Sequence, residues 1–418
     1  MIERVCPICL GEDSTKVFHR DFSGMKDIVP FSYYDVVRCT RCGAYFANHM
    51  VETMPLVLYY EKLSKYETKA FALSEAARIE YEFAIRLLRK KLIPTHSVLD
   101  LGCGNGALLH MLQEQGFKKL TGLEPSAMNC HAIEECWGVR AVPGALGEDV
   151  PALSGETFDA VLLVGVLEHL LDVRENVAHA LRYLADGGFL YLQVPDIGTF
   201  PSCRDLYQQF SVEHVNFFSL ASLKNLMQGF GMACVAHANE GCSIYSLWTA
   251  ALGERPVFQN DGEGQTAMEA YLHNSQHLAG AIQASLEPYR GQSVYLWGAG
   301  THTAMLYQLG LLDDLQIGAI IDSNANYQGK CIYDIPVIAP NELSQHPVRP
   351  IVISSQHAQK AIWQQIKEDM KLGCDALSMN SFRNAKCHII YVMVWDWNVV
   401  KWHLEDNEAM KCLIKGRY

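Results

Sequence analysis

The sequence contains neither a membrane-spanning run nor a secretion signal. A membrane span requires about 20 consecutive apolar residues, and the most apolar stretch, residues 160–171, is interrupted by Glu168 and His169. The first residues, MIERVCPICL, mix charged side chains with cysteines and contain no hydrophobic segment of the signal-peptide kind. We therefore expect a cytoplasmic protein that has no membrane partner.

Positive charge is also scarce. The 34 Lys and Arg residues are outnumbered by 46 Asp and Glu residues, which gives a formal net charge of −12. Such a chain is a poor general binder of nucleic acid or anionic lipid, and no basic cluster stands out in it. The composition, 49% apolar and 19% charged, excludes a disordered chain. We expect a small-molecule substrate, no nucleic-acid partner, and a monomer or weak homo-oligomer.

Cysteine, in contrast, is abundant, with 14 residues. Without a secretion signal, these cysteines point to thiols and metal ligands and not to a disulfide framework. Cys6 and Cys9 form one C-x2-C pair, and Cys39 and Cys42 form a second. A two-residue spacing lets one tight turn aim both sulfurs at one ion, and four thiolates complete a closed tetrahedral site. We predict structural Zn2+ here; four reduced, partly buried cysteines are the alternative.

Strand-like and helix-like segments alternate in two regions, which predicts α/β domains with mostly parallel sheets. The first alternation covers residues 95–253, and a helix is expected over residues 74–92. Residues 255–266 are polar and contain Gly and Pro, so we expect a linker there. The predicted domains are a zinc-binding module with a helical connector at residues 1–70, an α/β domain at 71–254 and a second α/β domain at 255–418.

The first α/β region opens with a glycine loop, VLDLGCGNG, which ends at Gly106 and leads into a helix. Its glycines permit a sharp turn and close approach of a ligand to the backbone. Glu124 follows 18 residues after Gly106, where an acid can accept hydrogen bonds from ribose hydroxyls. The spacing is G-x-G-x-G, whereas the pattern of NAD-binding folds is G-x-G-x-x-G. An NAD-binding fold is therefore kept only as the alternative.

Four segments resemble class I S-adenosylmethionine-dependent methyltransferases: DLGCGNG, GLEPS, the run from Phe158 to His169, and GGFLYLQVPD. The resemblance implies a Rossmann-like sheet over residues 71–254 and S-adenosylmethionine as cofactor. The methionine part would lie at the glycine loop, the ribose at the acid after the second strand, and the adenine after the third. The implied cofactor residues are Asp100, Gly102, Gly104, Gly106, Glu124, Ala145, Leu146 and Val164.

A second candidate site is the segment FSVEHVNFFS, which places Glu213 and His214 beside aromatic residues. Histidine needs the least adjustment of its pKa to transfer protons near neutrality. On its own the pair also fits an ordinary surface pair or a hydrogen-bonded core histidine. Glu213 and His214 are nevertheless our candidate catalytic residues, because of the context in which they occur.

The order of the features resembles the C-methyltransferases of deoxysugar biosynthesis, which act on nucleotide-linked 4-keto-6-deoxysugars. The shared order is a zinc module, a methyltransferase core, an EHxxxFS segment and a second, Rossmann-like domain, as far as about residue 380. The resemblance implies that His214 removes a proton beside the ketone and that the enolate takes the methyl group. It implies that Glu213 binds or orients the sugar, and that the product serves polysaccharide or secondary-metabolite biosynthesis.

The resemblance also suggests substrate contacts. The family brings tyrosines of the connector toward the sugar, here Tyr59, Tyr60 and Tyr66, although an aromatic helix face packed on the core is the alternative. It has Tyr where this chain has Ser211 and Arg where this chain has Tyr245. Both positions are candidate substrate contacts, and the two differences leave the methylated atom open.

A second glycine loop, WGAGTHT, follows a strand-like run, with Asp322 22 residues after Gly300. Thr303 occupies the place of a third glycine, so the pattern supports NAD binding only weakly. The resemblance implies that this domain helps to hold the sugar nucleotide, and a helix N-terminus there could accept a phosphate. A purely structural role and a second cofactor are the alternatives. The candidate residues are Gly298, Gly300, Thr301, His302 and Asp322.

Three functions compete with carbon methylation. O- or N-methylation would keep the methyl donor but need no 4-keto group. An NAD-dependent oxidoreductase or epimerase would use the second glycine loop and carry NAD(H) absorbance. A non-catalytic sugar-nucleotide-binding protein would bind without turnover, but the complete cofactor loop argues against it.

Overall fold

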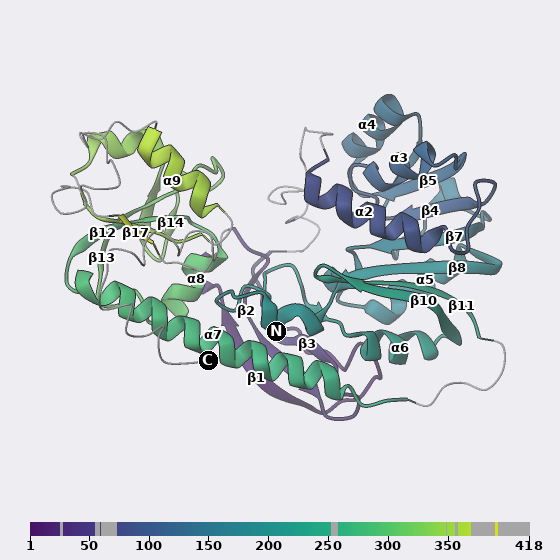
Figure 1. The fold of residues 1–418 in the computed structure, drawn as a ribbon, viewed down its shortest axis with the longest axis horizontal. Helices are drawn as coiled ribbons and strands as arrows, with labels where there is room; N and C mark the ends of the chain where they lie inside the picture. The colour runs from purple at the N-terminus through teal and green to yellow at the C-terminus, as the bar shows by residue number, and fades with distance from the viewer. Residues whose placement is uncertain are drawn as a thin grey trace, which may run out of the picture. The chain divides into compact units, whose positions relative to one another are not determined.

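The computed structural model describes residues 1–25, 28–54, 59, 73–251, 258–347, 349–355, 358–368 and 389–391 (Figure 1). The chain divides into two compact units. The first comprises residues 1–202 and 209–271, and the second comprises residues 203–208 and everything from 272 onward. Within the described residues, no helix has the length and apolar character that crossing a membrane requires.

The cysteine pairs flank a small antiparallel sheet of order β1-β2-β3-β9 in the first unit, and Cys39 is the last residue of β2. Its last strand comes from a distant part of the sequence and pairs Tyr45 with Phe217 and Phe46 with Asn216. The cysteine-bearing module is therefore continuous, through backbone hydrogen bonds, with the segment that follows His214. The strands are β1 (Ser14–Asp21), β2 (Phe31–Cys39), β3 (Tyr45–Glu52) and β9 (Asn216–Phe217), and a 3-10 turn, η1, covers Ser23–Met25.

The main sheet of the first unit has seven strands in the order β10-β11-β8-β7-β4-β5-β6. The five strands from β8 to β6 in that order run parallel, whereas β10 and β11 form an antiparallel edge. This confirms the predicted α/β class. The strands are β4 (Ser97–Leu101), β5 (Lys119–Glu124), β6 (Arg140–Pro143), β7 (Phe158–Val164), β8 (Leu184–Pro195), β10 (Met232–Glu240) and β11 (Ser243–Ala250).

Helices cover both faces of this sheet, which explains why its central strands are mostly apolar on both faces. Leu99 and Leu163 face one core, which includes residues of α5 and α6, while Val98 and Leu162 face the other core with residues of α2, α3 and α4. The predicted helix over 74–92 is confirmed as α2, which ends earlier, at Leu88. The helices are α2 (Glu75–Leu88), α3 (Ala107–Glu114), α4 (Ala127–Trp137), α5 (Val173–Arg182) and α6 (Leu220–Gln228), with 3-10 turns η2 (Pro151–Leu153), η3 (Leu167–His169) and η4 (Ile197–Ser202).

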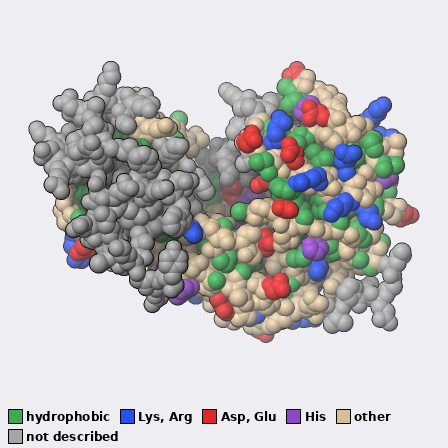
Figure 2. Space-filling view, in the orientation of Figure 1, with side chains coloured by type: hydrophobic (Ala, Val, Ile, Leu, Met, Phe, Trp, Pro, Cys, Tyr) green, Lys and Arg blue, Asp and Glu red, His purple; other side chains and the backbone are tan. Residues whose placement is uncertain are grey.

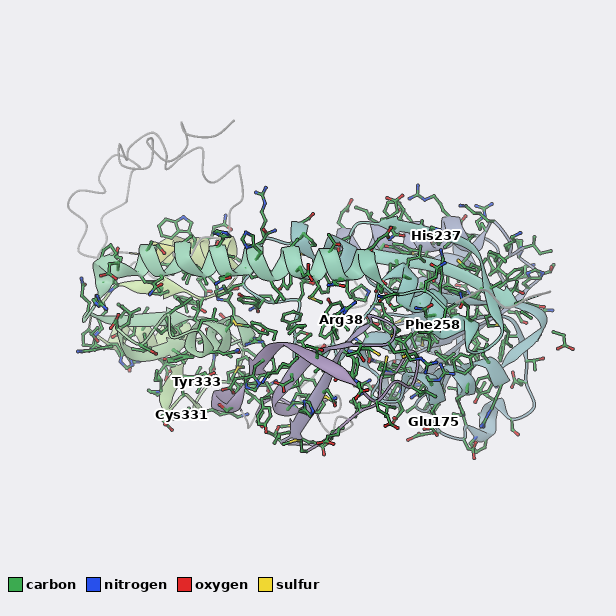
Figure 3. The ribbon with its side chains drawn as sticks, turned by 90° about the horizontal axis from the view of Figure 1, so that it is seen from below. Arg38, Glu175, His237, Phe258, Cys331 and Tyr333 are labelled. Atoms are coloured by element: carbon green, nitrogen blue, oxygen red, sulfur yellow. The ribbon has the colours of Figure 1, made fainter. Side chains whose placement is uncertain are left out.

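The stretch expected to be a linker, residues 255–266, contains the start of a long helix, α7 (Gly262–Leu286). This part of the linker prediction was wrong. The buried Asp261 carboxylate accepts a hydrogen bond from the Gly264 backbone N–H at 2.8 Å and another from the Ser219 hydroxyl, so it caps the first turn. Arg38 of β2, labelled in Figure 3, also donates to Asn260 just before the helix.

The second unit contains a six-stranded sheet of order β14-β15-β13-β12-β16-β17. Strands β15, β13, β12, β16 and β17 are parallel, and β14 joins them antiparallel. The strands expected around residues 294, 317 and 351 are all present. The elements are η5 (Glu287–Tyr289), β12 (Ser293–Trp297), α8 (Thr301–Gln308), β13 (Gln316–Ile321), β14 (Cys331–Ile332), β15 (Ile335–Ile338), η6 (Pro340–Gln345), β16 (Ile351–Ile353), α9 (Gln359–Glu368) and β17 (Ile389–Tyr391).

Charges of both signs are mixed on the surface of the first unit. Figure 2 shows Lys and Arg side chains interspersed with Asp and Glu side chains over the helices that cover its seven-stranded sheet. Among the described residues on this visible face, no continuous basic area stands out.

Candidate active site

The first glycine loop lies at a switch in strand order. After β4, the chain adds β5 and β6 on one side and then β7 on the other. Ligands of open α/β sheets bind beyond the carboxyl ends of the strands at such a point. The loops that follow β4 and β7 are adjacent, because a Cβ atom on Gly102 would lie 3.0 Å from the Val166 side chain.

Two glycines of this loop are required by its shape. Gly106, with φ of 72°, caps α3 in the left-handed conformation. Gly104 has φ of 57°, and an added Cβ would meet no atom within 4 Å. The backbone at Gly104 therefore borders open space, which a ligand can approach closely.

Two acids surround the loop. The Glu124 carboxylate, at the end of β5, accepts hydrogen bonds from the backbone N–H groups of Gly104 at 3.1 Å and Ser126 at 3.2 Å. Asp100, at 2% exposure, is buried in β4. Burial, with a further contribution from the Glu124 charge, raises the pKa of Asp100 to about 7. Burial also raises the pKa of Glu124.

The acids fit the cofactor that the sequence implies. The Asp100 Oδ1 atom has no hydrogen-bond partner within the described part of the chain. A buried carboxylate oxygen without a donor is costly, and the ammonium group of S-adenosylmethionine would supply one. The remaining predicted cofactor residues lie along the same edge: Ala145 and Leu146 follow β6 and are half-buried, and the half-buried Val164 ends β7.

A pair of histidines lies beyond β7. The His169 and His214 rings meet edge to face with centroids 4.8 Å apart. The His169 Nδ1 atom lies 3.2 Å from the Glu213 carbonyl oxygen, and the backbone N–H of Val215 donates to the Glu168 carbonyl oxygen at 2.8 Å. The two histidine-bearing segments are thus joined by backbone as well as by side chains.

Glu168 completes this cluster. It is 3% exposed, and burial raises its pKa to about 8, so the neutral acid predominates at pH 7. Its Oε2 atom has no hydrogen-bond partner within the described residues. The Glu168 Oε1 atom lies 4.0 Å from His169 Nε2, whereas ligands of one tetrahedral Zn2+ ion are about 3.3 Å apart. The cluster would have to close before it could hold a metal, so we interpret it as an acid–base group.

The sequence did not single out Glu168 and His169 as site residues. They belong to the VLEH run that was used only to recognise the fold. The available signal was their position, since they follow the strand that borders the switch in strand order. The sequence contained no sign that the second histidine, 45 residues later, would meet the first.

The predicted carboxylate and one predicted tyrosine do come together. The Tyr59 hydroxyl donates to Glu213 Oε1 at 2.9 Å, and both side chains are buried. Tyr60 and Tyr66 lie outside the described residues. The Ser211 hydroxyl accepts the backbone N–H groups of Glu213 at 3.3 Å and His214 at 3.0 Å.

Tyr245 lies elsewhere. It is 1% exposed on β11, and its ring centroid is 6.0 Å from that of Phe83, in the core that includes α2. Burial raises the pKa of Tyr245 to about 12. The contact of Tyr245 with substrate remains a prediction. The other three candidates, Ser211, Glu213 and His214, lie together in one turn.

The four predicted metal ligands form one cluster. The two C-x2-C turns have the same backbone hydrogen bonds: the N–H of Cys6 donates to Gly11 and that of Cys39 donates to Ala44, each at 2.9 Å. The equivalent residues Leu10 and Gly43 both have positive φ. The sulfur atoms of Cys6 and Cys42 are 3.5 Å apart, those of Cys9 and Cys39 are 3.6 Å apart, and all four lie within 4.8 Å of one another. A tetrahedral Zn2+ ion with four thiolates spaces them by about 3.8 Å, so the set fits this ion.

The second glycine loop is closed by its own polar groups. Asp322 at the end of β13 accepts the Ala299 N–H at 2.7 Å and the Asn324 N–H at 2.8 Å. The His302 Nδ1 atom lies 3.1 Å from the Ser354 hydroxyl. Thr303 donates to the Gly298 carbonyl oxygen and lies 2.7 Å from the same serine hydroxyl.

The other predicted residues of this loop lie around the same turn. An added Cβ at Gly298 would collide with the Ser354 carbonyl oxygen, whereas Gly300 borders open space. The Thr301 hydroxyl donates to Gln208 at 3.1 Å.

Known proteins match this chain mainly over the first α/β region. Residues 74–237 match the family described as "Methyltransferase domain", and residues 291–375 match "C2185-like, N-terminal". The ubiquinone biosynthesis O-methyltransferase of Methylobacterium nodulans is 33% identical over 98 residues, which are 23% of this chain and 39% of that protein. A probable (S)-tetrahydroprotoberberine N-methyltransferase of Papaver bracteatum is 30% identical over 100 residues, 23% of this chain and 28% of that protein.

These curated relatives are therefore matched over less than half of their own length. A solved structure of a methyltransferase from Thermotoga maritima, possibly a histamine N-methyltransferase, is 22% identical; the match covers 41% of this chain and 89% of that one, with a TM-score of 0.34.

Residues 74–237 carry the family match, the switch in strand order and the glycine loop together. The chain thus contains a class I S-adenosylmethionine-dependent methyltransferase domain.

Proposed function

We propose that this protein methylates a carbon atom beside the ketone of a nucleotide-linked 4-keto-6-deoxysugar. The observation that carries the proposal is the pairing of His214 with His169, whose ring also meets the Glu213 backbone carbonyl oxygen, at the end of the loop that borders the cofactor loop. Two imidazoles and a buried acid, Glu168, at the switch in strand order can supply a base for proton abstraction from carbon and a donor for the resulting charge.

The cofactor would be held by the first glycine loop. Asp100 would accept from the ammonium group, Glu124 would accept from the ribose hydroxyls, and Ala145 and Leu146 would border the adenine. When bound, S-adenosylmethionine supplies an electrophilic methyl group on a sulfonium. The open space at Gly104 and the unpartnered oxygen of Asp100 support this assignment.

His214 would act as the base. It takes the proton from the carbon beside the ketone, and the electron pair of that C–H bond moves into the enolate. The negative charge on the enolate oxygen must be met by a donor, and protonated His169 or the neutral acid of Glu168 can supply one. Glu213, held by Tyr59, would orient the sugar hydroxyls.

Zinc would serve the fold and not the reaction. Four thiolates leave no open coordination position for substrate, so Cys6, Cys9, Cys39 and Cys42 would form a closed structural site. One of them, Cys39, ends β2 of the four-stranded sheet whose strand β9 starts two residues after His214.

For the second unit we propose a supporting role in binding the nucleotide-linked part of the substrate. The open space at Gly300, at the N-terminus of α8, supports this role. Thr301, His302 and Asp322 would then act mainly by shaping the loop, since each is hydrogen-bonded to another residue of the second unit.

O- or N-methylation is the second candidate function. The named relatives are an O-methyltransferase and an N-methyltransferase, and Ser211 and Tyr245 differ from the sugar C-methyltransferase pattern. In this case His214 would deprotonate a hydroxyl or amine, and no ketone would be needed.

Methyl transfer from 13C-methyl-labelled S-adenosylmethionine tests the proposal. The acceptors are nucleotide-linked sugars with and without a 4-keto group, and NMR locates the label. We expect the label on carbon beside the ketone, and we expect His214→Ala to abolish it while S-adenosylhomocysteine still binds. Label on oxygen or nitrogen would contradict carbon methylation and favour the second candidate. His237→Ala is a control, because this exposed histidine, labelled in Figure 3, lies on β10, the edge strand of the seven-stranded sheet.

A further inference from the structure

Arg4 is anchored in the cysteine-bearing module, two residues before Cys6. Its backbone N–H donates to the Asn48 side-chain oxygen at 2.7 Å, and the Asn48 amide donates back to the Arg4 carbonyl oxygen at 3.3 Å. Asn48 is a buried residue of β3. The guanidinium carbon also lies 5.6 Å from the centroid of the Phe46 ring. The start of the Arg4 side chain is thus fixed by the sheet that carries the metal cluster.

The guanidinium reaches the two segments that carry the histidines. It donates to the Leu171 carbonyl oxygen at 2.7 Å, two residues after His169. It also donates to the Val215 carbonyl oxygen at 3.1 Å and to the Asn216 side-chain oxygen at 2.7 Å, directly after His214. Burial lowers the pKa of Arg4 to about 10, which leaves it a cation at neutral pH.

Asn216 closes the connection. Its side-chain amide donates to the carbonyl oxygens of Leu167 at 2.9 Å and Leu170 at 2.6 Å, on either side of His169. Its side-chain oxygen is the acceptor for Arg4. A single charged side chain therefore connects both segments, and the amide beside it locks them together.

We propose that Arg4 is a positioning residue that holds the His169 segment against the His214 segment and so sets the contact between the two imidazoles. The proposal rests on the proposed function in one respect, the role of His214 as base. Its consequence is that the cysteine-bearing module takes part in catalysis: whatever displaces Arg4, including loss of the ion from the neighbouring Cys6, misplaces the base.

The test uses the full-length protein with 15N-labelled histidine. The imidazole signals of His169 and His214 are assigned with the His169→Gln and His214→Gln variants, and both are titrated with pH. Arg4→Met removes the donors, and Arg4→Lys keeps the charge with a single point of attachment, so it serves if Arg4→Met does not fold. These readouts need no sugar substrate, so they stand even if the proposed reaction fails.

Arg174→Met is the matched control. Arg174 donates to the Ile8 carbonyl oxygen at 3.0 Å and lies 4.8 Å from the Phe230 ring centroid. It also ties the cysteine-bearing module to the methyltransferase domain, but through the Cys6–Cys9 turn and α5. Loss of Arg174 therefore removes a contact of similar kind without touching the histidine segments.

We expect both Arg4 variants to shift both imidazole signals and to move their titration midpoints by about half a pH unit or more. Arg174→Met should leave both unchanged. The Kd for S-adenosylhomocysteine should stay within about twofold of the parent, and bound zinc should be retained. With an accepted substrate, Arg4→Met should lower kcat about 100-fold at nearly constant KM, with partial recovery in Arg4→Lys.

The proposal is overturned if the Arg4 variants lower the melting temperature as Arg174→Met does and leave both imidazole titrations unchanged. Arg4 would then only fasten the module. Equal shifts of the imidazole signals in the Arg4 and Arg174 variants would also overturn it, because the effect would then come from general loosening.

Discussion

The two glycine loops are built alike but leave different capacity for a ligand. In each, a strand leads through glycines into a helix, and an acid at the end of the next strand accepts a loop N–H: Glu124 from Gly104 at 3.1 Å and Asp322 from Ala299 at 2.7 Å. In the first loop, buried Asp100 keeps an oxygen without a partner in the described residues.

In the second loop the polar groups are hydrogen-bonded to neighbouring residues of the protein. Thr303, at the place of a third glycine, bonds the Gly298 carbonyl oxygen and meets the Ser354 hydroxyl, which also lies beside His302. The position equivalent to Asp100, two residues before the first glycine of the loop, is the buried Leu296 and not an acid. The number of glycines therefore says less about ligand binding than the number of buried polar atoms that still need a partner.

The largest expected effect comes from the cysteine-bearing module, whose strand β3 pairs with β9, just after His214. Cys39→Ser should release zinc and destabilise the module by several kcal/mol. Peptides covering residues 210–217 should then exchange amide hydrogen faster, because β9 and its Arg4 and β3 contacts loosen. Peptides covering residues 293–308 of the second unit should not change. Hydrogen–deuterium exchange by mass spectrometry makes the measurement, with Cys136→Ser, an exposed cysteine, as control.

An equal increase of amide exchange in residues 210–217 and 293–308 would contradict the expected difference between the two regions. Retention of zinc in Cys39→Ser would contradict the four-thiolate site itself.

The next largest difference between the two glycine loops is expected when a side chain fills the open space beside each of them. Gly104→Val places a branched side chain in open space next to the backbone, at a φ of 57° that β-branched residues rarely adopt. We expect the Kd for S-adenosylhomocysteine to rise at least about 100-fold. Gly300→Val, also in open space but at a φ of −90°, should leave this Kd unchanged. Calorimetric titration decides, and a loss of binding in the Gly300 variant would reverse the assignment of the two loops.

The acid of the first loop should give a pH dependence. The pKa of Asp100 is raised from 3.8 to about 7 in the folded protein. In the free protein, stability from this group is therefore complete below about pH 4 and is lost as the pH rises toward 7. A bound ammonium group favours the carboxylate, so affinity for S-adenosylhomocysteine should rise with pH up to about 7.

Asp100→Asn should remove that pH dependence and weaken binding about tenfold at pH 8. Calorimetry between pH 5.5 and 8.5 checks both. Affinity that falls with rising pH in this range would contradict the role of Asp100.

The smallest effect is expected from the closed loop. Thr303→Val removes a hydroxyl that bonds the Gly298 carbonyl oxygen and lies beside Ser354, and should cost about 1–2 kcal/mol of the free energy of unfolding of the second unit. Thr303→Ser should restore most of it. Urea denaturation measures the change, and S-adenosylhomocysteine binding should be unaffected. An unchanged free energy of unfolding would show that these hydrogen bonds do not stabilise the loop.

The sequence predicted best what is encoded by short segments. The turn that ends at Gly106, the acid at Glu124 and both C-x2-C turns are local, and their geometry follows from residue spacing. The α/β sheet followed from the alternation of strand-like and helix-like segments.

Contacts between distant segments were harder to foresee. His169 meets His214 across 45 residues, and nothing local announces the contact. The bond from Tyr59 to Glu213 spans 154 residues. The family resemblance directed both side chains toward the sugar but did not predict that they bond each other. The linker prediction was wrong at its C-terminal end because Asp261 caps a helix there. The Asp261 carboxylate is hydrogen-bonded to Ser219, which lies 42 residues earlier.

Solvent exchange of the substrate proton tests the central claim most directly. A nucleotide-linked 4-keto-6-deoxysugar is incubated in D2O with the protein and S-adenosylhomocysteine, and NMR follows deuterium at the carbon beside the ketone. The account predicts exchange at one carbon above the uncatalysed rate, its loss in His214→Ala, and its survival in the Gly104→Val variant, which keeps the base but binds the methyl donor poorly. Exchange that persists in His214→Ala, or its absence while methyl label reaches oxygen or nitrogen, would contradict the enolate mechanism.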